Sequence, residues 1–346
     1  MRVARTLARR TIAVEQSTAP EPGPGEALVR MHTVTLCGTD VHIFDDDYAT
    51  ELPIVQGHEI AGVVETAPHG SGVAPGDRVA VSPMRYCGSC HACRIGRVNA
   101  CRNSSCLGCY QDGGLAELIA VPASDLHPIP DGLPLELAAL AEPTSIAMQA
   151  GLRGRPQRGE LALVLGCGPI GLLTTLHLSS LGVEVVAADV SEGRSAFARR
   201  FGAAATVVVG NAPMPAEPPL VVEASGAPEA FDLALGSVAT AGRVVLLGIS
   251  DRQVALSMRT LPVKDLDLLG SRNSQRRMGQ ALDLLAAHPE AATALLTHQF
   301  PLERVADAFE LLGSAQELVG KVAIDFSRST AGTATGVATD LAEEQR

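Results

Sequence analysis

Four cysteines within one short stretch have the residue type and the spacing of a metal-binding loop. They follow the pattern C-x2-C-x2-C-x7-C, with Cys87, Cys90, Cys93 and Cys101 at its ligand positions. Thiolates are soft ligands, and four of them close together favour tetrahedral Zn²⁺ with no open position for a substrate. Two disulfides or four unrelated thiols are the alternatives. The pattern predicts a structural zinc site, which locates a metal without indicating an activity.

A second group of residues could hold a metal of the catalytic kind. Cys37 opens the stretch CGTDVH, which carries Thr39 and His42, and Gly57-His58-Glu59 follows further along the chain. A thiolate, an imidazole and a carboxylate can bind zinc and leave one position for water or substrate. A further acid, Glu142, lies in the stretch AEPTS. Taken singly, each residue has an ordinary alternative, such as a buried cysteine that acts as a small apolar side chain.

A glycine-rich turn later in the chain has the features of a dinucleotide-binding site. The apolar run 161–165 leads into the turn GCGPIG and then into a helical pattern, and a second apolar run ends at Asp189. Glycines let the backbone approach a pyrophosphate at a helix N-terminus, and an acid after the second strand accepts from ribose hydroxyls. That carboxylate would repel a 2′-phosphate, so the pattern favours NAD over NADP. A flavin site, or a similar domain that binds nothing, is the alternative. The residues that we expect at the cofactor are Gly166, Gly168, Pro169, Ile170, Gly171, Asp189, Arg194, Gly248 and Ile249.

The elements that must position these residues are of two kinds. Residues 1 to about 148 hold short β-type runs between glycine- and proline-rich turns, whereas apolar strand candidates alternate with helical stretches from Leu161 onward. The alternation predicts a parallel, doubly wound sheet. After it we expect a helix over 280–287, a loop HPE, a helix near 306–312, a strand over 321–326 and a disordered tail. The strand candidates of the alternating region are 161–166, 184–189, 205–209, 220–225, 243–248 and 266–270.

Length, charge and cysteine usage narrow the class of protein. The chain has 346 residues, which favours two domains, and a formal net charge of −11, which argues against binding to nucleic acid or to an anionic membrane. No apolar run approaches the roughly 20 residues that span a bilayer, and the N-terminus lacks the apolar core of a signal peptide. Cysteines used as metal ligands fit a reducing compartment. We therefore expect a cytoplasmic protein.

These motifs together resemble the zinc-containing medium-chain alcohol dehydrogenases, over residues 1 to about 326. The family motifs G-H-E, C-G-[TS]-D-x-H and G-x-G-P-I-G match residues 57–59, 37–42 and 166–171, and the structural zinc cysteines are all present. The resemblance implies an α/β protein with a GroES-like, mostly β catalytic domain over 1–148. It implies a Rossmann doubly wound NAD-binding domain over 149–274, a return to the catalytic domain over 275–327 and a disordered tail over 328–346.

The resemblance also implies roles for the candidate residues. Cys37 and His58 match the family's catalytic zinc ligands, and either Glu59 or Glu142 completes the zinc sphere, since Glu142 matches the E-P-x-[SA] acid of the sorbitol and threonine dehydrogenase branch. Thr39 and His42 match a proton relay that includes the nicotinamide ribose. The implied reaction is hydride transfer between an alcohol and NAD, with two zinc ions per chain, in a homodimer or homotetramer.

The branch implies a substrate class. The stretches AEPTS, QDGG, GSRNS and LTHQF are similar to those of enzymes that oxidise polyols, sugar acids and aminocyclitols. Arg272 or Asn273 would reach the outer hydroxyls of such a substrate, and Arg272 could instead pair with a carboxylate or cofactor phosphate, or be a solvated loop residue. An amino alcohol such as L-threonine, or a simple alcohol, is the alternative substrate. A non-catalytic zinc-binding module is the alternative of another class.

One feature departs from the family pattern. Cys106 and Cys109 form a further C-x2-C just beyond the four-cysteine loop. We expect buried or partly buried thiols, because the first four cysteines already supply one zinc. A redox-labile pair, or a competing pair of metal ligands, is the alternative.

Overall fold

The computed structural model describes residues 1–314 and 318–328, so the tail expected over 328–346 lies outside the described residues except for Arg328. The chain divides into two compact units. The β-rich unit contains residues 1–85, 105–140 and those from 292 onward, and the parallel-sheet unit contains residues 86–104 and 141–291. The segment 86–104, which carries the four-cysteine loop, therefore leaves the β-rich unit and packs with the parallel-sheet unit.

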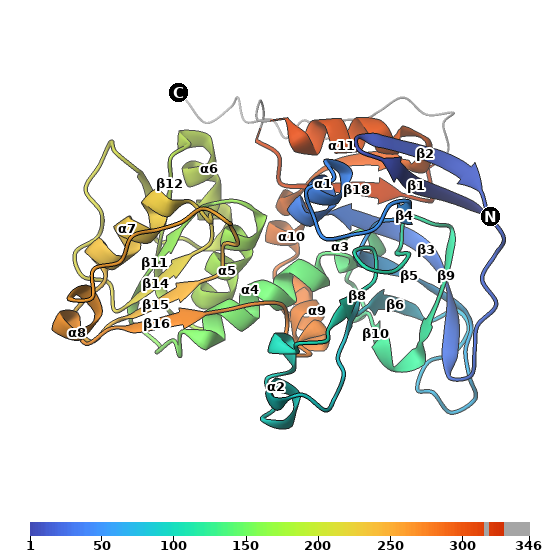
Figure 1. Ribbon diagram of the computed structural model, residues 1–346, viewed down its shortest axis with the longest axis horizontal. Helices are drawn as coiled ribbons and strands as arrows, with labels where there is room; N and C mark the ends of the chain where they lie inside the picture. Colours follow the sequence, from blue (N-terminus) through green and yellow to red (C-terminus); the bar gives the residue numbers. More distant parts are fainter. Residues whose placement is uncertain (315–317, 329–346) are drawn as a thin grey trace. The chain divides into compact units, whose positions relative to one another are not determined.

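The β-rich unit is built on a seven-stranded sheet in the order β10-β6-β5-β3-β18-β17, with β9 also paired to β3 (Figure 1). Side chains along β3 alternate between buried and less buried positions, as expected for a strand with one face on a core. A three-stranded sheet, β2-β1-β4, and a short pair, β7-β8, complete the unit. The strands are β1 (Arg2–Ala8), β2 (Thr11–Gln16), β3 (Glu26–Leu36), β4 (Ile54–Val55), β5 (Glu59–Thr66), β6 (Arg78–Val81), β7 (Met84–Arg85), β8 (Ser105–Cys106), β9 (Leu118–Pro122), β10 (Leu126–Pro128), β17 (Leu296–Pro301) and β18 (Lys321–Asp325).

Two helices of this unit are joined by their aromatic side chains. Phe44 ends α1 (Gly38–Phe44), and its ring centroid lies 4.8 Å from that of Phe309 in α11 (Val305–Gly313). Both rings are buried in the same core as strands β3, β5 and β6. The contact fixes α1, which carries several of the candidate site residues, against the body of the unit. The unit also contains the short helix α3 (Leu135–Ala138).

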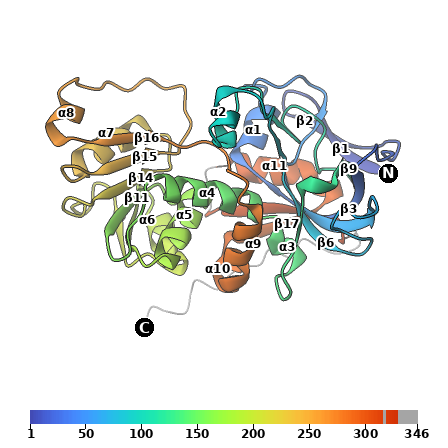
Figure 2. The same ribbon diagram turned by 90° about the horizontal axis from the view of Figure 1, so that it is seen from below.

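The parallel-sheet unit has six parallel strands in the order β13-β12-β11-β14-β15-β16. Alternate residues of β11 face opposite ways: Ala162 and Val164 pack with α4 and α5, whereas Leu163 and Leu165 pack with α7. Helices therefore cover both faces of the sheet, as Figures 1 and 2 show. The elements are α4 (Ala141–Arg153), β11 (Leu161–Leu165), α5 (Pro169–Ser180), β12 (Glu184–Asp189), α6 (Glu192–Phe197), β13 (Ala205–Val208), β14 (Leu220–Glu223), α7 (Pro228–Ser237), β15 (Arg243–Leu246), α8 (Thr260–Lys264), β16 (Asp267–Gly270) and α9 (Met278–Ala287).

The architecture confirms the expected fold class, with one local correction. All six strands expected in the alternating region are present, in the strand order of a doubly wound dinucleotide-binding sheet. The loop expected at HPE is wrong beyond His288, because Pro289 begins helix α10 (Pro289–Leu295). Proline suits the first position of a helix, where its missing N–H costs no hydrogen bond. Among the described residues, no helix is long and apolar enough to span a membrane.

Candidate metal and cofactor sites

Cys37 lies at the start of α1, where the chain leaves β3. It is half-buried and occupies the N-cap position in extended conformation. The buried carboxylate of Asp40, three residues further on, accepts a hydrogen bond from the Cys37 backbone N–H at 2.8 Å. The hydroxyl of Thr39 lies 4.0 Å from the Cys37 Sγ. The first turn of the helix thus places a thiol and a hydroxyl side by side.

His58 is held in the turn that precedes β5. Gly57 makes this turn possible, because its φ is +94° and a Cβ there would lie 2.7 Å from a methyl carbon of Val34. The same Asp40 carboxylate accepts from the Gly57 N–H at 3.3 Å and lies 3.7 Å from the Nδ1 of His58. A carboxylate behind a metal-binding histidine fixes the orientation of its ring. Asp40, which has no role among the sequence-based predictions, therefore connects two candidate ligands.

The ligand atoms of Cys37, His58 and Glu59 lie within 4.8 Å of one another. Burial opposes protonation of His58, but the Asp40 carboxylate and the thiol of Cys109 outweigh it and raise the pKa of the imidazole well above its ordinary value. The group thus attracts positive charge, which a divalent cation can supply in place of a proton. The donor set fits zinc.

Glu59 has other partners in this group. Its buried carboxylate forms an ion pair with Lys321 of β18 and accepts a hydrogen bond from the hydroxyl of Thr35 in β3. Lys321 is itself buried and also donates to the Leu36 carbonyl. The carboxylate charge of Glu59 is therefore balanced within the protein.

The remaining candidates near this group differ in burial. His42 is exposed in the last turn of α1, and its Nδ1 lies 2.9 Å from a carboxylate oxygen of Asp47. Glu142 is buried near the start of α4 and belongs to the parallel-sheet unit. Its role as a metal ligand stays a prediction, as do the relay roles of Thr39 and His42.

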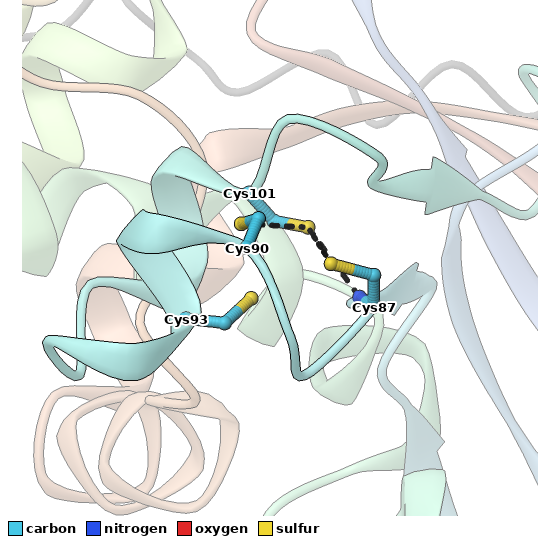
Figure 3. Close-up of side chains that lie close together, drawn as sticks. All are labelled: Cys87, Cys90, Cys93 and Cys101. Carbon is cyan, nitrogen blue, oxygen red and sulfur yellow. Dashed lines mark hydrogen bonds between the residues drawn. The ribbon is translucent and has the colours of Figure 1, made fainter.

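The four cysteines of the metal-binding loop converge in the parallel-sheet unit (Figure 3). Their Sγ atoms all lie within 4.8 Å of one another, and none of these cysteines forms a disulfide. Cys90 precedes the short helix α2 (His91–Arg94), and Cys93 lies in it. Cys101 follows a 3-10 turn over Val98–Ala100 and is buried, whereas the other three are half-buried. Four sulfurs at this separation form a closed tetrahedral donor set that fits zinc.

Backbone groups of the loop favour thiolate at two of these cysteines. The N–H groups of Ser89 and Cys90 lower the pKa of Cys87 to about 6, and the backbone of Cys93 and Arg102 lowers the pKa of Cys90. Burial and the neighbouring thiols of Cys90 and Cys101 raise the pKa of Cys93 to about 12. The shifts are opposite because backbone N–H groups stabilise the thiolates of Cys87 and Cys90, whereas burial and the neighbouring thiols favour the protonated form of Cys93.

The loop is fastened to the segment that follows β16. The Asn99 side chain donates to the Arg272 carbonyl at 2.9 Å, and the Tyr86 hydroxyl donates to the Ser274 carbonyl at 2.8 Å. The amide of Asn273 donates to the Asn99 carbonyl at 3.4 Å, and Gln275 donates to Gly96. These contacts give Asn273 a structural role. The predicted contacts of Arg272 and Asn273 with substrate stay predictions.

The glycine-rich turn joins β11 to α5. Gly168 is the N-cap of α5 and Pro169 its first residue, followed by Ile170. A Cβ on Gly171 would lie 1.9 Å from the Gly166 carbonyl oxygen, so only glycine fits at 171, whereas the space above Gly168 is open. A turn that is closed beneath and open at the helix N-terminus fits a pyrophosphate.

Asp189 ends β12 beside this turn. Its two carboxylate oxygens accept from the N–H groups of Cys167 and Ser191, at 2.8 and 2.9 Å. A carboxylate has about four acceptor sites, so it can still accept from ribose hydroxyls. The backbone N–H of Arg194 donates to the Ser191 hydroxyl at the start of α6, and Gly248 and the exposed Ile249 follow β15.

The second cysteine pair lies in the β-rich unit. Cys106 and Cys109 are buried among apolar side chains, and the Cys109 Sγ lies 3.8 Å from the Nδ1 of His58. The hydrogen bond with Cys106, together with burial, raises the pKa of the Cys109 thiol. A raised pKa disfavours the thiolate, which is the form that binds metal.

Comparisons with known proteins agree with this geometry. The family model "Alcohol dehydrogenase GroES-like domain" matches residues 23–131, and the model "Glucose dehydrogenase C-terminus" matches residues 135–326. The chain is 31% identical to sorbitol dehydrogenase of Rattus norvegicus, over 86% of this chain and 89% of that protein. It is 33% identical to L-threonine 3-dehydrogenase of Pyrococcus horikoshii, over 88% and 92%.

Solved structures give the same result. An alcohol dehydrogenase of Escherichia coli CFT073, complexed with NADH, superimposes with a TM-score of 0.87 at 29% identity, covering 94% of this chain and 99% of that one. L-idonate 5-dehydrogenase of Escherichia coli K-12 has a TM-score of 0.88 at 26% identity, covering 94% and 98%. The chain therefore belongs to the zinc-type alcohol dehydrogenase family, oxidoreductases that act on CH–OH groups with NAD(P).

Proposed function

We propose that this protein oxidises a secondary hydroxyl of a polyol, sugar acid or aminocyclitol to the ketone with NAD, and reduces the ketone in reverse. The observation that carries the proposal is the convergence of Cys37, His58 and Glu59, with the Thr39 hydroxyl beside the thiol. Relatives named for sorbitol and L-idonate support the substrate class.

Cys37 and His58 would hold the catalytic zinc, and either Glu59 or Glu142 would complete its ligand set. Glu59 also has Lys321 and Thr35 as partners, so the test is which of the two acids the metal depends on. When bound, zinc supplies a Lewis acid at the substrate hydroxyl and NAD supplies a hydride acceptor. Asp40 keeps the His58 ring oriented from behind, through its contact with Nδ1.

The chain's own groups would remove the proton of the substrate hydroxyl. Thr39 would accept it at Oγ1 and pass its own hydroxyl proton onward, and the exposed ring of His42 would release a proton to water. The turn at residues 166–171 would bind the pyrophosphate, and Asp189 would bind the adenosine ribose and disfavour a 2′-phosphate.

A screen of NADH formation across polyols, sugar acids, aminocyclitols, amino acids and ethanol tests the substrate class. We expect ethanol to be poor beside the best polyol or sugar acid. The variant Glu142→Gln should lower kcat by about a hundredfold, within the range for lost catalytic electrostatics, with NAD affinity unchanged. Ethanol turnover equal to that of the best polyol, together with a silent Glu142→Gln, would contradict the proposal.

An amino alcohol is the second candidate substrate, because L-threonine 3-dehydrogenase of P. horikoshii is 33% identical to this chain. The same screen separates the candidates, since an amino-alcohol enzyme would turn over L-threonine faster than any polyol. A simple alcohol substrate would be indicated by fast ethanol oxidation.

We also propose that the protein is a cytoplasmic homodimer or homotetramer. Thiolate zinc ligands favour a reducing compartment. Large apolar side chains are exposed in the parallel-sheet unit, among them Met258 at 90% and Val263 at 61% exposure. Large apolar side chains exposed to this degree support a contact surface with a second copy of the chain. Light scattering after size-exclusion chromatography should give a mass of two or four chains, and a monomer would refute this proposal.

A further inference from the structure

The C-terminal end of α1 adopts a particular capping arrangement. Asp46 has a φ of +55°, in the left-handed region, directly after the C-cap residue Asp45. The Asp46 N–H bonds to the Ile43 carbonyl at 3.1 Å, and the Asp47 N–H bonds to the His42 carbonyl at 3.0 Å. These two bonds define a Schellman motif. The motif places Asp47, two positions after the C-cap, over His42, the third residue from the end of the helix.

In this motif an acid and a histidine occupy the two positions that meet. The Nδ1 of His42 lies 2.9 and 3.1 Å from the two carboxylate oxygens of Asp47. The motif more often pairs two apolar side chains at these positions. Here the backbone hydrogen bond between the same two residues fixes the carboxylate beside the ring. The neighbouring acid Asp45 lies 3.3 Å from Arg10 instead.

We propose that Asp47 is a positioning residue for the proton relay, acting through His42. This inference rests on the relay role given to His42 in the proposed function. The carboxylate is an acceptor only, so Nδ1 must carry the ring proton and the lone pair of the neutral imidazole stays on Nε2. Nε2 then accepts the proton that originates on the substrate hydroxyl and releases it to water, while the Nδ1 proton stays with Asp47.

The pair is too exposed to be explained by stability. Both side chains are more than half exposed, at 63% and 58%, and solvent-exposed ion pairs contribute little to folding. By contrast, a carboxylate can set the orientation and the tautomer of a histidine ring even when both side chains are exposed. Histidine in water prefers the tautomer with the proton on Nε2, which could not accept there. Asp47 reverses that preference.

A double-mutant cycle tests the proposal on the full-length, zinc-loaded enzyme with NAD and its best alcohol. We expect Asp47→Ala to lower kcat about tenfold and His42→Ala about a hundredfold, with KM for NAD and zinc content unchanged. In the His42→Ala background, Asp47→Ala should have no further effect, because its action passes through the ring. Asp47→Glu should restore part of the rate. Asp46→Asn removes one negative charge from the neighbouring residue, whose side chain has no hydrogen bond with His42. Its kcat should equal that of the unmodified enzyme.

A second measurement is independent of turnover. ¹⁵N-histidine NMR of the cofactor-free protein, with the His42 signal assigned by its loss in His42→Ala, should show the Nδ1–H tautomer in the unmodified chain and in Asp46→Asn. In Asp47→Ala it should show Nε2–H. An unchanged tautomer, or an equal loss of kcat from Asp47→Ala in both backgrounds, would overturn the proposal. An active His42→Ala enzyme would instead overturn the relay role of His42.

Discussion

The two cysteine-containing sites of this protein are built in opposite ways. The four-cysteine site takes all its ligands from one loop, and three of the four are half-buried. The group around Cys37 draws on the N-cap of α1 and the start of β5, and two of its three members are buried. Its members also contact charged and polar partners, namely Asp40, Lys321 and Thr35. A closed site needs only its ligands, whereas a site for chemistry needs partners that fix each ligand.

The sharpest test of this difference is to remove one ligand from the group around Cys37. Cys37→Ala should reduce turnover to background and lose one of two zinc ions, while thermal stability stays close to that of the unmodified protein. Metal analysis, activity and calorimetry measure the three effects. Cys106→Ala removes a buried thiol of the same unit and should keep both metals. Normal activity in Cys37→Ala would break the comparison.

Removal of one ligand from the four-cysteine site should act on stability. Cys90→Ala should lose the other zinc and at least about 5 kcal/mol of stability, because structural zinc contributes its binding energy to folding. At roughly 2–4 °C per kcal/mol, Tm should fall by about 10–20 °C. Ser89→Ala, whose hydroxyl lies 3.7 Å from the Cys87 Sγ without being a ligand, is the control. An unchanged Tm in Cys90→Ala would show that this site is not structural.

The buried ion pair of Glu59 gives a third test. Lys321→Met should cost about 3–5 kcal/mol, because it leaves the Glu59 carboxylate buried without its cation. The double variant Glu59→Gln/Lys321→Met should recover much of that loss and retain the catalytic zinc, if Glu142 is the third ligand. Denaturant unfolding and metal analysis check both expectations. Loss of zinc from the double variant would assign Glu59 to the metal instead.

The smallest expected effect concerns the cofactor. Catalytic efficiency with NAD should exceed that with NADP by at least about tenfold, roughly 1.4 kcal/mol, and Asp189→Ala should narrow the gap. Steady-state kinetics with both cofactors measure it. Neither metal should be affected, so the variant also shows that the cofactor turn is independent of both sites. Equal use of NADP by the unmodified enzyme would contradict the role of Asp189.

Patterns within short segments made the parallel sheet and the four-cysteine loop predictable from the sequence. The six parallel strands follow from apolar runs, and the cysteine loop follows from spacing within one segment. Contacts between distant segments carry no such pattern: Lys321 meets Glu59 across 262 positions, and Asn99 meets Arg272 across 173. The Asp47–His42 pair is close in sequence, yet it depends on the left-handed backbone conformation of Asp46. A glycine at that position would have predicted this conformation, whereas an aspartate does not.

The fastening of the cysteine loop to residues 272–275 has a consequence for the order of folding. The loop's own thiols meet across only 14 positions, so a metal can close it at a small entropic cost as soon as Cys101 has left the ribosome. Its hydrogen-bonding partners are synthesised far later. We expect the loop to fold first, closed by its metal, as a local structure on the growing chain. The last strands of the parallel sheet would pack against it later. Zinc supply during translation would then govern the yield of folded protein.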